Sequence, residues 1–422
     1  MLYSRDSMPF TQFNLLPDLH KSVRAMGFAS PTPIQVQAIP PAMEGQDVLG
    51  SAQTGSGKTA AFVLPMLQKL LAEKGRPEPQ SGAAHAVKAL IMVPTRELAA
   101  QVETAVRDLA RFSPVRCALL IGGTSFPNQL QALRQGAEIV VATPGRLLDH
   151  HRRRTISLGG VRTAVLDEAD RMLDMGFMPD IRRIMQLLPR DRQTLMFSAT
   201  IPPEVERVVG EFMREPVRIS IDRPASPASG IVQMLYPVSL DQKYDLLLAI
   251  LKNVQVTSAV IFTRTKARAD RVARFLEGKG IGVAVLHSNR TQIQRTQAME
   301  GFRRQKSQIL VATDIAARGI DVRHISHVIN FDVPQHAEDY VHRIGRTGRV
   351  FAVGDAITLM TIDEQPFLTA IEAFIGQTIP RAALPDFPYR TPPVLVSYKP
   401  SATHHFRLRR TIARSSGMRF RR

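Results

Sequence analysis

The sequence has little of several residue types that mark particular classes of protein. Its one cysteine, Cys117, excludes an internal disulfide and fits a reducing cytosol. It has no tryptophan and only 6% aromatic residues, which argues against a surface built to stack nucleic-acid bases. No run approaches 18 consecutive apolar residues, so we predict no membrane span. The first ten residues lack the apolar core of a signal peptide, and we therefore expect a cytoplasmic protein.

Positive charge, by contrast, is in excess. The chain has 55 basic and 37 acidic residues and a formal net charge of +18. This excess indicates a polyanionic partner, and nucleic acid is the leading candidate. With 422 residues, 44% of them hydrophobic, the chain can form two or three domains with proper cores.

Short apolar runs alternate with helical patterns from about residue 10 to 220, and again after residue 230. The runs that we predict as strands are Leu90–Val93, Cys117–Ile121, Ile139–Ala142, Thr163–Leu166, Thr194–Phe197, Ala259–Phe262, Val283–Leu286, Gln308–Ala312, His327–Ile329 and Ala356–Leu359. Such alternation predicts βαβ units and parallel sheets. The segment 222–230, DRPASPASG, is typical of an exposed linker. We therefore predict an α/β protein with two parallel-sheet lobes, residues 1–221 and 231–385.

The last part of the chain, residues 386–422, has a different composition. Nine basic and no acidic residues lie from Tyr389 onward, and helical periodicity is weak. This composition predicts a mostly disordered basic tail. The tail either contacts nucleic acid through phosphates or only keeps the protein in solution. At the other end, Met1 and Met8 are both candidate starts, because the organised sequence begins near Phe10.

The segment Ala52–Thr59, AQTGSGKT, has the pattern of a phosphate-binding loop. It follows the apolar stretch Val48–Gly50 and precedes residues that favour a helix, which is the setting that such a loop needs. Its glycines permit a sharp turn, and successive backbone N–H groups then face an anion. We expect Lys58 to reach the β- and γ-phosphates and Thr59 to bind Mg²⁺. A glycine-rich turn with an incidental lysine is the alternative, which the full pattern disfavours.

A second motif, VLDEAD, ends with four residues that begin at Asp167. Asp167 and Glu168 follow the apolar run Ala164–Leu166, and ligands of open α/β sheets bind beyond the carboxyl ends of strands. An aspartate there can hold Mg²⁺, and the adjacent glutamate can orient or deprotonate an attacking water. Two solvated acids at a helix start are the alternative. Beside the phosphate-binding loop, the motif predicts hydrolysis of a nucleoside triphosphate.

Two further motifs lie in the second half of the chain. The first is HRIGRTGR, His342–Arg349. Its arginines suit a phosphoryl group on which negative charge develops, but they equally suit a basic turn that binds nucleic acid by charge alone. The second is ATDIAARGID, Ala312–Asp321, in which Thr313 and Asp314 close a predicted strand. Asp321 accepts hydrogen bonds from a ribose or is an ordinary capping carboxylate.

Taken together, these motifs give the chain a clear resemblance to the DEAD-box ATP-dependent RNA helicases, most closely to their bacterial RhlE-type branch. The resemblance covers about residues 8–385 and rests on many separate motifs in the family's order. It implies two RecA-like lobes, joined by the short linker and followed by the basic tail. The chain departs from the family at Ser288, where many members have glycine, and this puts only the local loop geometry in question.

The resemblance assigns a nucleotide site. The segment Gly27–Gln35 matches the family's adenine-recognition motif, within about residues 8–36, so that Gln35 binds the adenine edge and Phe10 stacks on the base. The implied ATP-binding residues are Phe10, Gln35, Ala52, Gln53, Thr54, Gly55, Ser56, Gly57, Lys58, Thr59, Gly319 and Asp321, and the implied Mg²⁺ ligands are Thr59 and Asp167. The implied catalytic residues are Lys58, Asp167, Glu168 and two arginine fingers, Arg346 and Arg349, which decides between the alternatives for HRIGRTGR.

The resemblance also assigns residues to RNA and to coupling. The implied RNA-binding residues are Pro94, Thr95, Arg96, Gly122, Gly123, Thr143, Pro144, Arg146, Arg264, Gln292, Arg295 and Thr313. Those that couple hydrolysis to strand separation are Asp170, Ser198, Thr200, His342 and Arg343. Glycine N–H groups and arginines suit phosphate oxygens better than base edges, so binding independent of RNA sequence is expected.

The function implied is that of an ATP-dependent RNA helicase that binds single-stranded RNA across two lobes and opens short duplexes locally. A DNA helicase with the same two lobes is one alternative. An RNA chaperone with a vestigial ATPase is another, although every expected catalytic position is filled. Ribosomal particles and the RNA-decay machinery are candidate partners. No coiled-coil heptads occur, so a monomer is expected.

Overall fold

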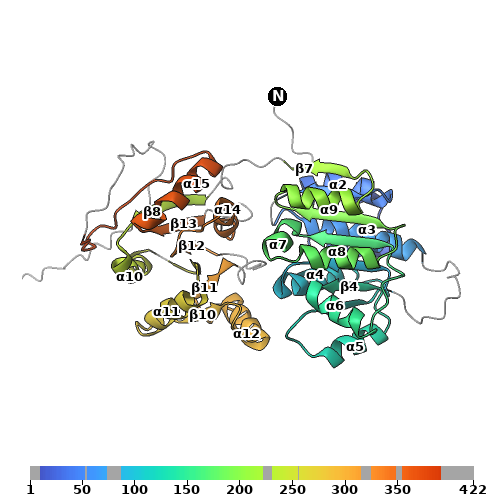
Figure 1. Ribbon diagram of the computed structural model, residues 1–422, viewed down its shortest axis with the longest axis horizontal. Helices are drawn as coiled ribbons and strands as arrows, with labels where there is room; N and C mark the ends of the chain where they lie inside the picture. Colours follow the sequence, from blue (N-terminus) through green and yellow to red (C-terminus); the bar gives the residue numbers. More distant parts are fainter. Residues whose placement is uncertain are drawn as a thin grey trace, which may run out of the picture. The chain divides into compact units, whose positions relative to one another are not determined.

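The computed structural model describes residues 10–52, 55–73, 87–221, 231–254, 256–314, 325–347 and 354–390. These residues separate into two compact units, here called lobes, each built around one β-sheet (Figure 1). The predicted linker, residues 222–230, and residues 391–422 of the predicted tail lie outside the described residues. Among the described residues, no helix has both the length and the apolar character that a membrane crossing requires.

The first lobe begins with a short 3-10 helix and continues with alternating helices and strands. Its elements are η1 (Phe10–Phe13), α1 (Pro17–Ala25), α2 (Pro33–Met43), β1 (Val48–Ser51), α3 (Lys58–Glu73), β2 (Ala89–Met92), α4 (Arg96–Leu109), β3 (Cys117–Leu120), α5 (Phe126–Arg134), β4 (Ile139–Ala142), α6 (Pro144–Arg152), β5 (Thr163–Asp167), α7 (Ala169–Asp174), α8 (Met178–Leu187), β6 (Gln193–Ser198), α9 (Pro203–Phe212) and β7 (Val217–Ser220). The seven strands have the order β3-β4-β2-β5-β6-β1-β7. All neighbouring strands are parallel.

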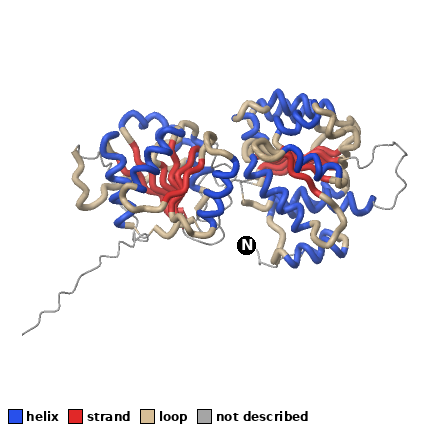
Figure 2. Tube along the Cα trace, turned by 90° about the horizontal axis from the view of Figure 1, so that it is seen from below, coloured by secondary structure: helices blue, strands red, loops and turns tan. Residues whose placement is uncertain are grey.

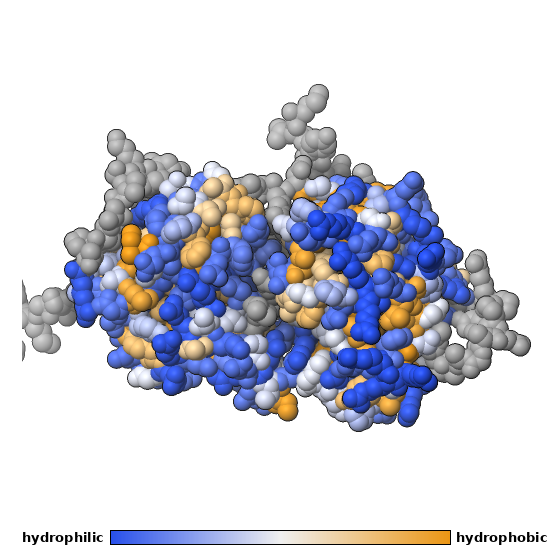
Figure 3. Space-filling model, in the orientation of Figure 1, coloured by the Kyte–Doolittle hydropathy of each residue, from blue (hydrophilic) through white to orange (hydrophobic). Residues whose placement is uncertain are grey.

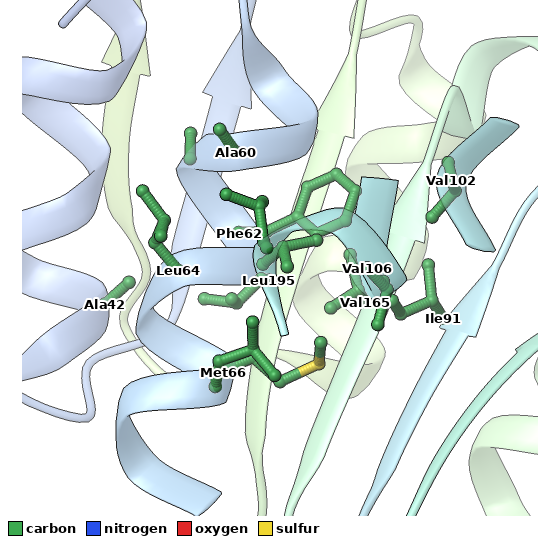
Figure 4. Packing of buried hydrophobic residues seen from close by; sticks show 14 of the residues in the cluster. Ala42, Ala60, Phe62, Leu64, Met66, Ile91, Val102, Val106, Val165 and Leu195 are labelled. Carbon is green, nitrogen blue, oxygen red and sulfur yellow. The ribbon is translucent and has the colours of Figure 1, made fainter. Parts of the chain in front are cut away.

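The strands of this sheet are apolar on both faces because helices cover both faces (Figure 2). Successive residues alternate between two hydrophobic clusters: Leu195 packs with α2, α3 and α4, whereas Met196 packs with α6, α8 and α9. Figure 4 shows the first cluster, with Phe62 and Met66 of α3 beside Leu195. Each fully buried side chain of this size contributes about 1.5–3 kcal/mol to folding. The double coverage explains why these strands are short continuous apolar runs in the sequence.

The second lobe repeats the architecture with six strands. Its elements are β8 (Ile231–Pro237), η2 (Leu240–Gln242), α10 (Lys243–Asn253), β9 (Ala259–Thr263), α11 (Lys266–Glu277), β10 (Val283–Leu286), α12 (Gln292–Arg303), β11 (Ile309–Thr313), β12 (His327–Asn330), α14 (Ala337–Ile344), β13 (Gly354–Met360), η3 (Ile362–Glu364) and α15 (Gln365–Ile375). The strand order is β10-β11-β9-β12-β13-β8, again with parallel neighbours. On the face drawn in Figure 3, each lobe has a mostly hydrophilic surface with scattered apolar residues.

These sheets confirm the predicted fold class of two parallel-sheet lobes. Each of the ten predicted strands corresponds to an observed one, with ends that differ by one or two residues at most. The segment that follows α15 packs back on the second lobe: Phe387 and Tyr389 contact its hydrophobic cluster, and the Arg390 N–H donates to Gln242 Oε1 at 2.8 Å. Residues 386–390 of the predicted tail are therefore ordered against this lobe.

Candidate active site and nucleic-acid interface

The candidate site residues of the first lobe lie at one edge of its sheet. In a parallel sheet all strands end at the same edge, so the loops that follow them converge there. The phosphate-binding loop follows β1, Glu168 follows β5, and Ala199–Thr200 follow β6. These three strands are neighbours in the sheet. The motifs assigned to RNA follow the other neighbours, β2, β4 and β3, so one edge carries two adjacent groups of residues.

The phosphate-binding loop leads from β1 into α3. Gly55 and Gly57 have φ angles of +84° and +94°, which L side chains rarely adopt. Lys58 is 6% exposed, and its ammonium donates to Ala52 O at 2.9 Å, across the loop. Ser56 Oγ is buried without a hydrogen-bond partner among the described residues. A buried hydroxyl without a partner and a buried ammonium in one glycine-rich loop are suited to an anion. Gln53 and Thr54 of the predicted set lie outside the described residues.

Gln35 joins the adenine-recognition motif to this loop. It lies in the first turn of α2, where its Oε1 accepts from Thr32 N at 2.9 Å in a capping box. Its Nε2 donates to Gly57 O at 3.0 Å. A Cβ atom on Gly57 would lie 2.5 Å from this Nε2 and 2.8 Å from Thr32 Oγ1. The absence of a side chain at residue 57 therefore lets the loop and α2 meet.

Phe10 is predicted to stack on a base, and the structure places its ring against those of Phe13 and Phe28. Its ring is 5% exposed. It stacks on Phe28, with ring centroids 6.0 Å apart, and contacts the edge of Phe13 at 5.8 Å. Phe10 thus belongs to a small aromatic group at the border of the hydrophobic core.

The two carboxylates predicted to hold the metal and the water lie at the end of β5. Asp167 is buried beside Lys58, Glu168 and Asp170, and burial raises the pKa of its carboxyl to about 6 while Lys58 opposes that rise. Glu168 adopts left-handed backbone angles, φ 56° and ψ 51°. Its carboxylate forms a buried ion pair with Arg171, with Nη1 and Oε2 2.6 Å apart. Arg171 had no predicted role, because nothing in the sequence distinguishes it from the chain's other arginines.

The third acid of the motif, Asp170, lies in the first turn of α7 and connects this helix to the loop after β6. Its Oδ2 accepts hydrogen bonds from Ala199 N at 3.1 Å, from Thr200 N at 2.7 Å and from Thr200 Oγ1 at 2.9 Å. In the opposite direction, Asp170 N donates to Ser198 Oγ at 3.1 Å, and this hydroxyl donates to Thr200 O at 2.6 Å. The predicted residues Asp170, Ser198 and Thr200 therefore form one hydrogen-bonded unit.

The other half of the edge carries the residues assigned to RNA. Pro94 and Thr95 follow β2, and Thr95 caps α4 by accepting from Leu98 N at 3.2 Å. Arg96 reaches from α4 across Gly122 and Gly123, which follow β3. A Cβ atom on Gly123 would lie 2.3 Å from Arg96 Nη1, and one on Gly122 would lie 3.2 Å from Arg96 Nη2. These glycines therefore make room for the guanidinium and keep their backbone accessible beside it.

Thr143, Pro144 and Arg146 complete this half, at the start of α6 after β4. Arg146 is half-buried, and its Nη1 donates to Thr124 O at 3.4 Å, in the loop that follows Gly123. The N-termini of α4 and α6 thus lie at the sheet edge with arginines near them. Helix N-termini, glycine amides and guanidinium groups together favour a polyanionic backbone.

The second lobe holds its predicted residues at the corresponding edge. Arg264 follows β9; its backbone N–H donates to Asp332 Oδ2 at 2.8 Å and its Nη2 to Glu364 Oε1 at 2.8 Å. Glu364 also accepts from Lys243 Nζ at 2.7 Å, and Lys243 is 1% exposed. Burial lowers the pKa of this lysine, while Glu364 and Asp332 raise it. These hydrogen bonds, to Asp332 and Glu364, hold the backbone and the guanidinium of Arg264 in place. They were not predicted from the sequence.

Thr313 ends β11, next to Thr263 of β9. Asp314, the next residue, binds the guanidinium of Arg343 in α14 through two hydrogen bonds of 2.6 and 2.7 Å. The same guanidinium donates to Asn330 Oδ1 at 3.1 Å. The predicted coupling role of Arg343 stays a prediction. Arg346 is 4% exposed, and its Nε donates to the carbonyl of His342 at 3.3 Å.

The structure describes only some of the remaining predicted residues. Gln292 and Arg295 lie three residues apart in the first turn of α12, and so share one side of that helix. Gly319, Asp321 and Arg349 lie outside the described residues. Within the first lobe, the structure therefore brings the predicted nucleotide residues together on β1, β5 and β6, and the predicted RNA residues on β2, β3 and β4.

The fold and this sheet edge define an α/β nucleotide-binding enzyme. Comparison with protein families adds the finer class. A model described as DEAD/DEAH box helicase matches residues 32–208, and one described as helicase conserved C-terminal domain matches residues 242–351.

Similar proteins agree with these matches. The DEAD-box ATP-dependent RNA helicase CshA of Bacillus subtilis is 42% identical over 366 residues, which are 87% of this chain and 72% of that protein. The ATP-dependent RNA helicase CshA of Listeria monocytogenes is 43% identical, over 86% of this chain and 68% of that protein. Among solved structures, S. cerevisiae Dbp5 bound to RNA and ADP BeF3 is 30% identical with a TM-score of 0.78, covering 89% of this chain and 95% of that chain. Mss116p bound to ssRNA and AMP-PNP is 30% identical with a TM-score of 0.79, covering 88% of this chain and 78% of that chain.

The chain belongs to the DEAD-box family of ATP-dependent RNA helicases. The resemblance found in the sequence is thereby confirmed at the level of the family. Both bacterial relatives are named CshA, so the RhlE-type branch stays a prediction.

Proposed function

We propose that the first lobe binds ATP at the β1, β5 and β6 half of its sheet edge and RNA at the β2, β3 and β4 half. The observation that supports this division most strongly is the adjacency of the two groups of motifs in the strand order. The backbone amides of residues 52–59 surround the triphosphate, with Lys58 on its β- and γ-phosphates. Gln35 binds the adenine edge and Phe10 packs on the base. Gly319 and Asp321 of the second lobe complete the nucleotide contacts.

The donor atoms near the loop fit a magnesium ion. Thr59 would supply a hydroxyl oxygen and Asp167 a carboxylate oxygen; Thr59 follows Lys58 at the start of α3, and Asp167 is buried beside Lys58. Among the described residues, no group of three or more His, Cys, Asp and Glu side chains is placed to hold a metal by itself. Mg²⁺ typically takes one or two protein ligands and completes its shell with phosphates and water, so this sparse set is suited to it. When bound, the ion neutralises charge on the β- and γ-phosphates.

The chain's own groups carry the remaining chemistry. Glu168 orients the attacking water and accepts its proton, and the ion pair with Arg171 holds its carboxylate in place. Arg346 and Arg349 stabilise the charge that develops on the γ-phosphoryl group, a contribution of about 10³–10⁵ in rate in related chemistry. Since these arginines belong to the second lobe, hydrolysis is slow until ATP and RNA bring the lobes together.

RNA binds through its phosphates and 2′-hydroxyls, with no reading of base sequence. In the first lobe it contacts Arg96, the two glycines after β3, and Arg146. In the second it contacts Arg264, Gln292, Arg295 and Thr313. Because ATP and RNA favour the same closed arrangement, each tightens the binding of the other. The Asp170–Thr200 unit, with His342 and Arg343, transmits closure between the two sites.

Strand separation of a short RNA duplex tests this function. We expect the purified protein to separate the duplex with ATP and Mg²⁺, and Lys58→Ala to bind RNA in a salt-sensitive manner without hydrolysis or separation. A matched DNA duplex should stay paired. Separation at the wild-type rate by Lys58→Ala would rule out the assigned phosphate loop.

The cellular setting is a further part of the proposal. We propose that the protein acts in the cytoplasm as a monomer, on ribosomal particles or with the RNA-decay machinery. Sedimentation of the purified chain with and without RNA tests the oligomeric state.

A further inference from the structure

One aromatic ring beside the predicted RNA contact holds three other side chains. Phe126 is the first residue of α5. The ring of His150, from α6, stacks on it with centroids 4.2 Å apart and planes inclined by only 11°. The guanidinium carbon of Arg153 lies 4.6 Å from the centre of the Phe126 ring, and that of Arg146 lies 5.8 Å from it. Both guanidinium groups therefore lie close to the same aromatic ring.

A chain of buried hydrogen bonds holds the stacked rings in place. His150 is 0% exposed; its Nδ1 bonds with Thr155 Oγ1 at 2.8 Å and its Nε2 with Gln129 Oε1 at 3.2 Å. The amide of Gln129 donates to Ile121 O at 3.0 Å and to Thr124 Oγ1 at 2.7 Å. These bonds tie the stacked rings to the loop after β3, which contains the glycines assigned to RNA. The ring of Phe126 therefore has a defined position relative to that loop.

Arg146 and Arg153 differ from Arg152 in having no acidic partner among the described residues. Arg152, adjacent in sequence, forms an ion pair with Asp149 at 2.5 Å. Arg146 and Arg153 form no ion pair with an acid within the part of the chain that the structure describes. Arg153 is exposed and Arg146 is half-buried. A guanidinium stacked on an aromatic face keeps its N–H groups at the rim available for an anion.

We propose that Arg153 is a second phosphate-binding residue beside Arg146, and that Phe126 positions both guanidinium groups for one stretch of single-stranded RNA. The inference rests on the proposed function, which places Arg146 on RNA. It extends the RNA surface beyond the family motifs to a residue after the end of α6. The ring reduces the conformational freedom of two long side chains, so less entropy is lost when a phosphate binds. Contacts of this kind add affinity without sequence preference.

Binding of a fluorescent single-stranded RNA to the full chain, measured over a salt series, tests the proposal. Arg153→Gln should weaken binding at low salt by up to about fivefold, the effect of one exposed ion pair. It should also lower the slope of log K against log salt by about 0.7, the value for one phosphate contact on a single strand. The KM for RNA in ATP hydrolysis should rise, while kcat at saturating RNA and hydrolysis without RNA stay unchanged.

Two further variants separate positioning from general charge. Arg152→Gln removes the same charge one residue away, from an arginine already paired with Asp149, and should leave both affinity and slope unchanged. Phe126→Leu keeps an apolar side chain but removes the ring, and should weaken binding more than Arg153→Gln, because both guanidinium groups lose their support. Circular dichroism and the RNA-free ATPase confirm that each variant is folded.

Three results would overturn the proposal. Arg153→Gln could bind as wild type does at every salt concentration. Arg152→Gln could cause an equal loss, which would show diffuse charge attraction. Phe126→Leu could leave binding intact, which would show that the ring does not position the arginines. A wild-type protein that does not bind RNA would instead refute the proposed function itself.

Discussion

Asp170 and Thr200 are joined by two hydrogen bonds to a single carboxylate oxygen, one from the Thr200 backbone N–H at 2.7 Å and one from its hydroxyl at 2.9 Å. Because Asp170 lies in the first turn of α7, after β5, and Thr200 in the loop after β6, a displacement of one segment is passed to the other. Hydrogen bonds to a charged acceptor are stronger than neutral ones, so the joint is stiff. We propose that this joint links the nucleotide site to strand separation.

Thr200→Val tests the joint, since valine removes the hydroxyl and keeps the shape and the backbone N–H. We expect a loss of about 1 kcal/mol of stability from one hydrogen bond. ATP should still be hydrolysed, but fewer duplexes should be separated per ATP consumed. Thr104→Val is the matched control, because among the described residues the Thr104 hydroxyl donates to Ala100 O within α4 and to no other element. Equal duplex separation per ATP in both variants would show that the hydroxyl is not part of the coupling.

Gly57→Ala is expected to damage the ATP site more than Gly55→Ala. Both glycines have positive φ angles, so alanine strains the loop at either position. Only at Gly57 does the new Cβ meet other atoms, 2.5 Å from Gln35 Nε2, whereas nothing lies within 4 Å of a Cβ at Gly55. The KM for ATP, measured at saturating RNA, should therefore rise more for Gly57→Ala. An equal rise would mean that backbone strain alone matters and that the contact with Gln35 does not.

Removal of residues 391–422 is expected to weaken RNA binding and to flatten its dependence on salt. This segment has eight basic and no acidic residues. Every phosphate that the protein no longer neutralises lowers the slope of log K against log salt by about 0.7 on a single strand. The deletion begins at 391 because Tyr389 and Arg390 contact the second lobe. Unchanged binding across the salt series would leave the segment with a solubilising role only.

His150 is expected to make the first lobe less stable in mild acid. Burial, together with the nearby Arg146 and Arg153, lowers the pKa of its ring from 6.5 to about 4, and Asp149 opposes this only in part. The unfolded chain therefore takes up the proton first as the pH falls. The stability contributed by neutral His150 is complete above about pH 6.5 and is lost progressively toward pH 4.

Thermal unfolding at several pH values checks this expectation. Between pH 7.5 and 5, the melting temperature of the wild type should fall more than that of His150→Asn, whose side chain does not titrate. His151→Asn, a change at the adjacent residue, should behave as the wild type does. Identical pH profiles for wild type and His150→Asn would show that the ring is already protonated or plays no part.

The sequence predicted the buried strands well because parallel strands covered on both faces are continuous apolar runs. Val165 and Leu166, for example, face opposite helical layers, and both are fully buried. The edge strands β7 and β8 were not predicted as strands. Only Ile219 of β7 is buried, and β8 has a mixed pattern of exposure. One-sided burial leaves a weaker signal in the sequence.

The site was predictable where its chemistry lies in local motifs, and not where it depends on packing. Gln35 and Lys58 were found from motifs, but the bond from Gln35 to Gly57 joins residues that are far apart in the chain. Arg171 directly follows an acidic motif, yet only the fold shows that it is buried against Glu168. The stack of Phe126 on His150 has no sequence signal, because a phenylalanine and a histidine 24 residues apart occur together by chance in many chains.

RNA, we propose, completes the ATP-hydrolysing site, and hydrolysis measured with three additions tests this most directly. The same protein is assayed without nucleic acid, with single-stranded RNA, and with DNA of the same sequence. We predict slow hydrolysis of ATP by the protein alone, strong stimulation by RNA and little by DNA. Hydrolysis that ignores both nucleic acids, or that responds equally to DNA, would contradict the proposal.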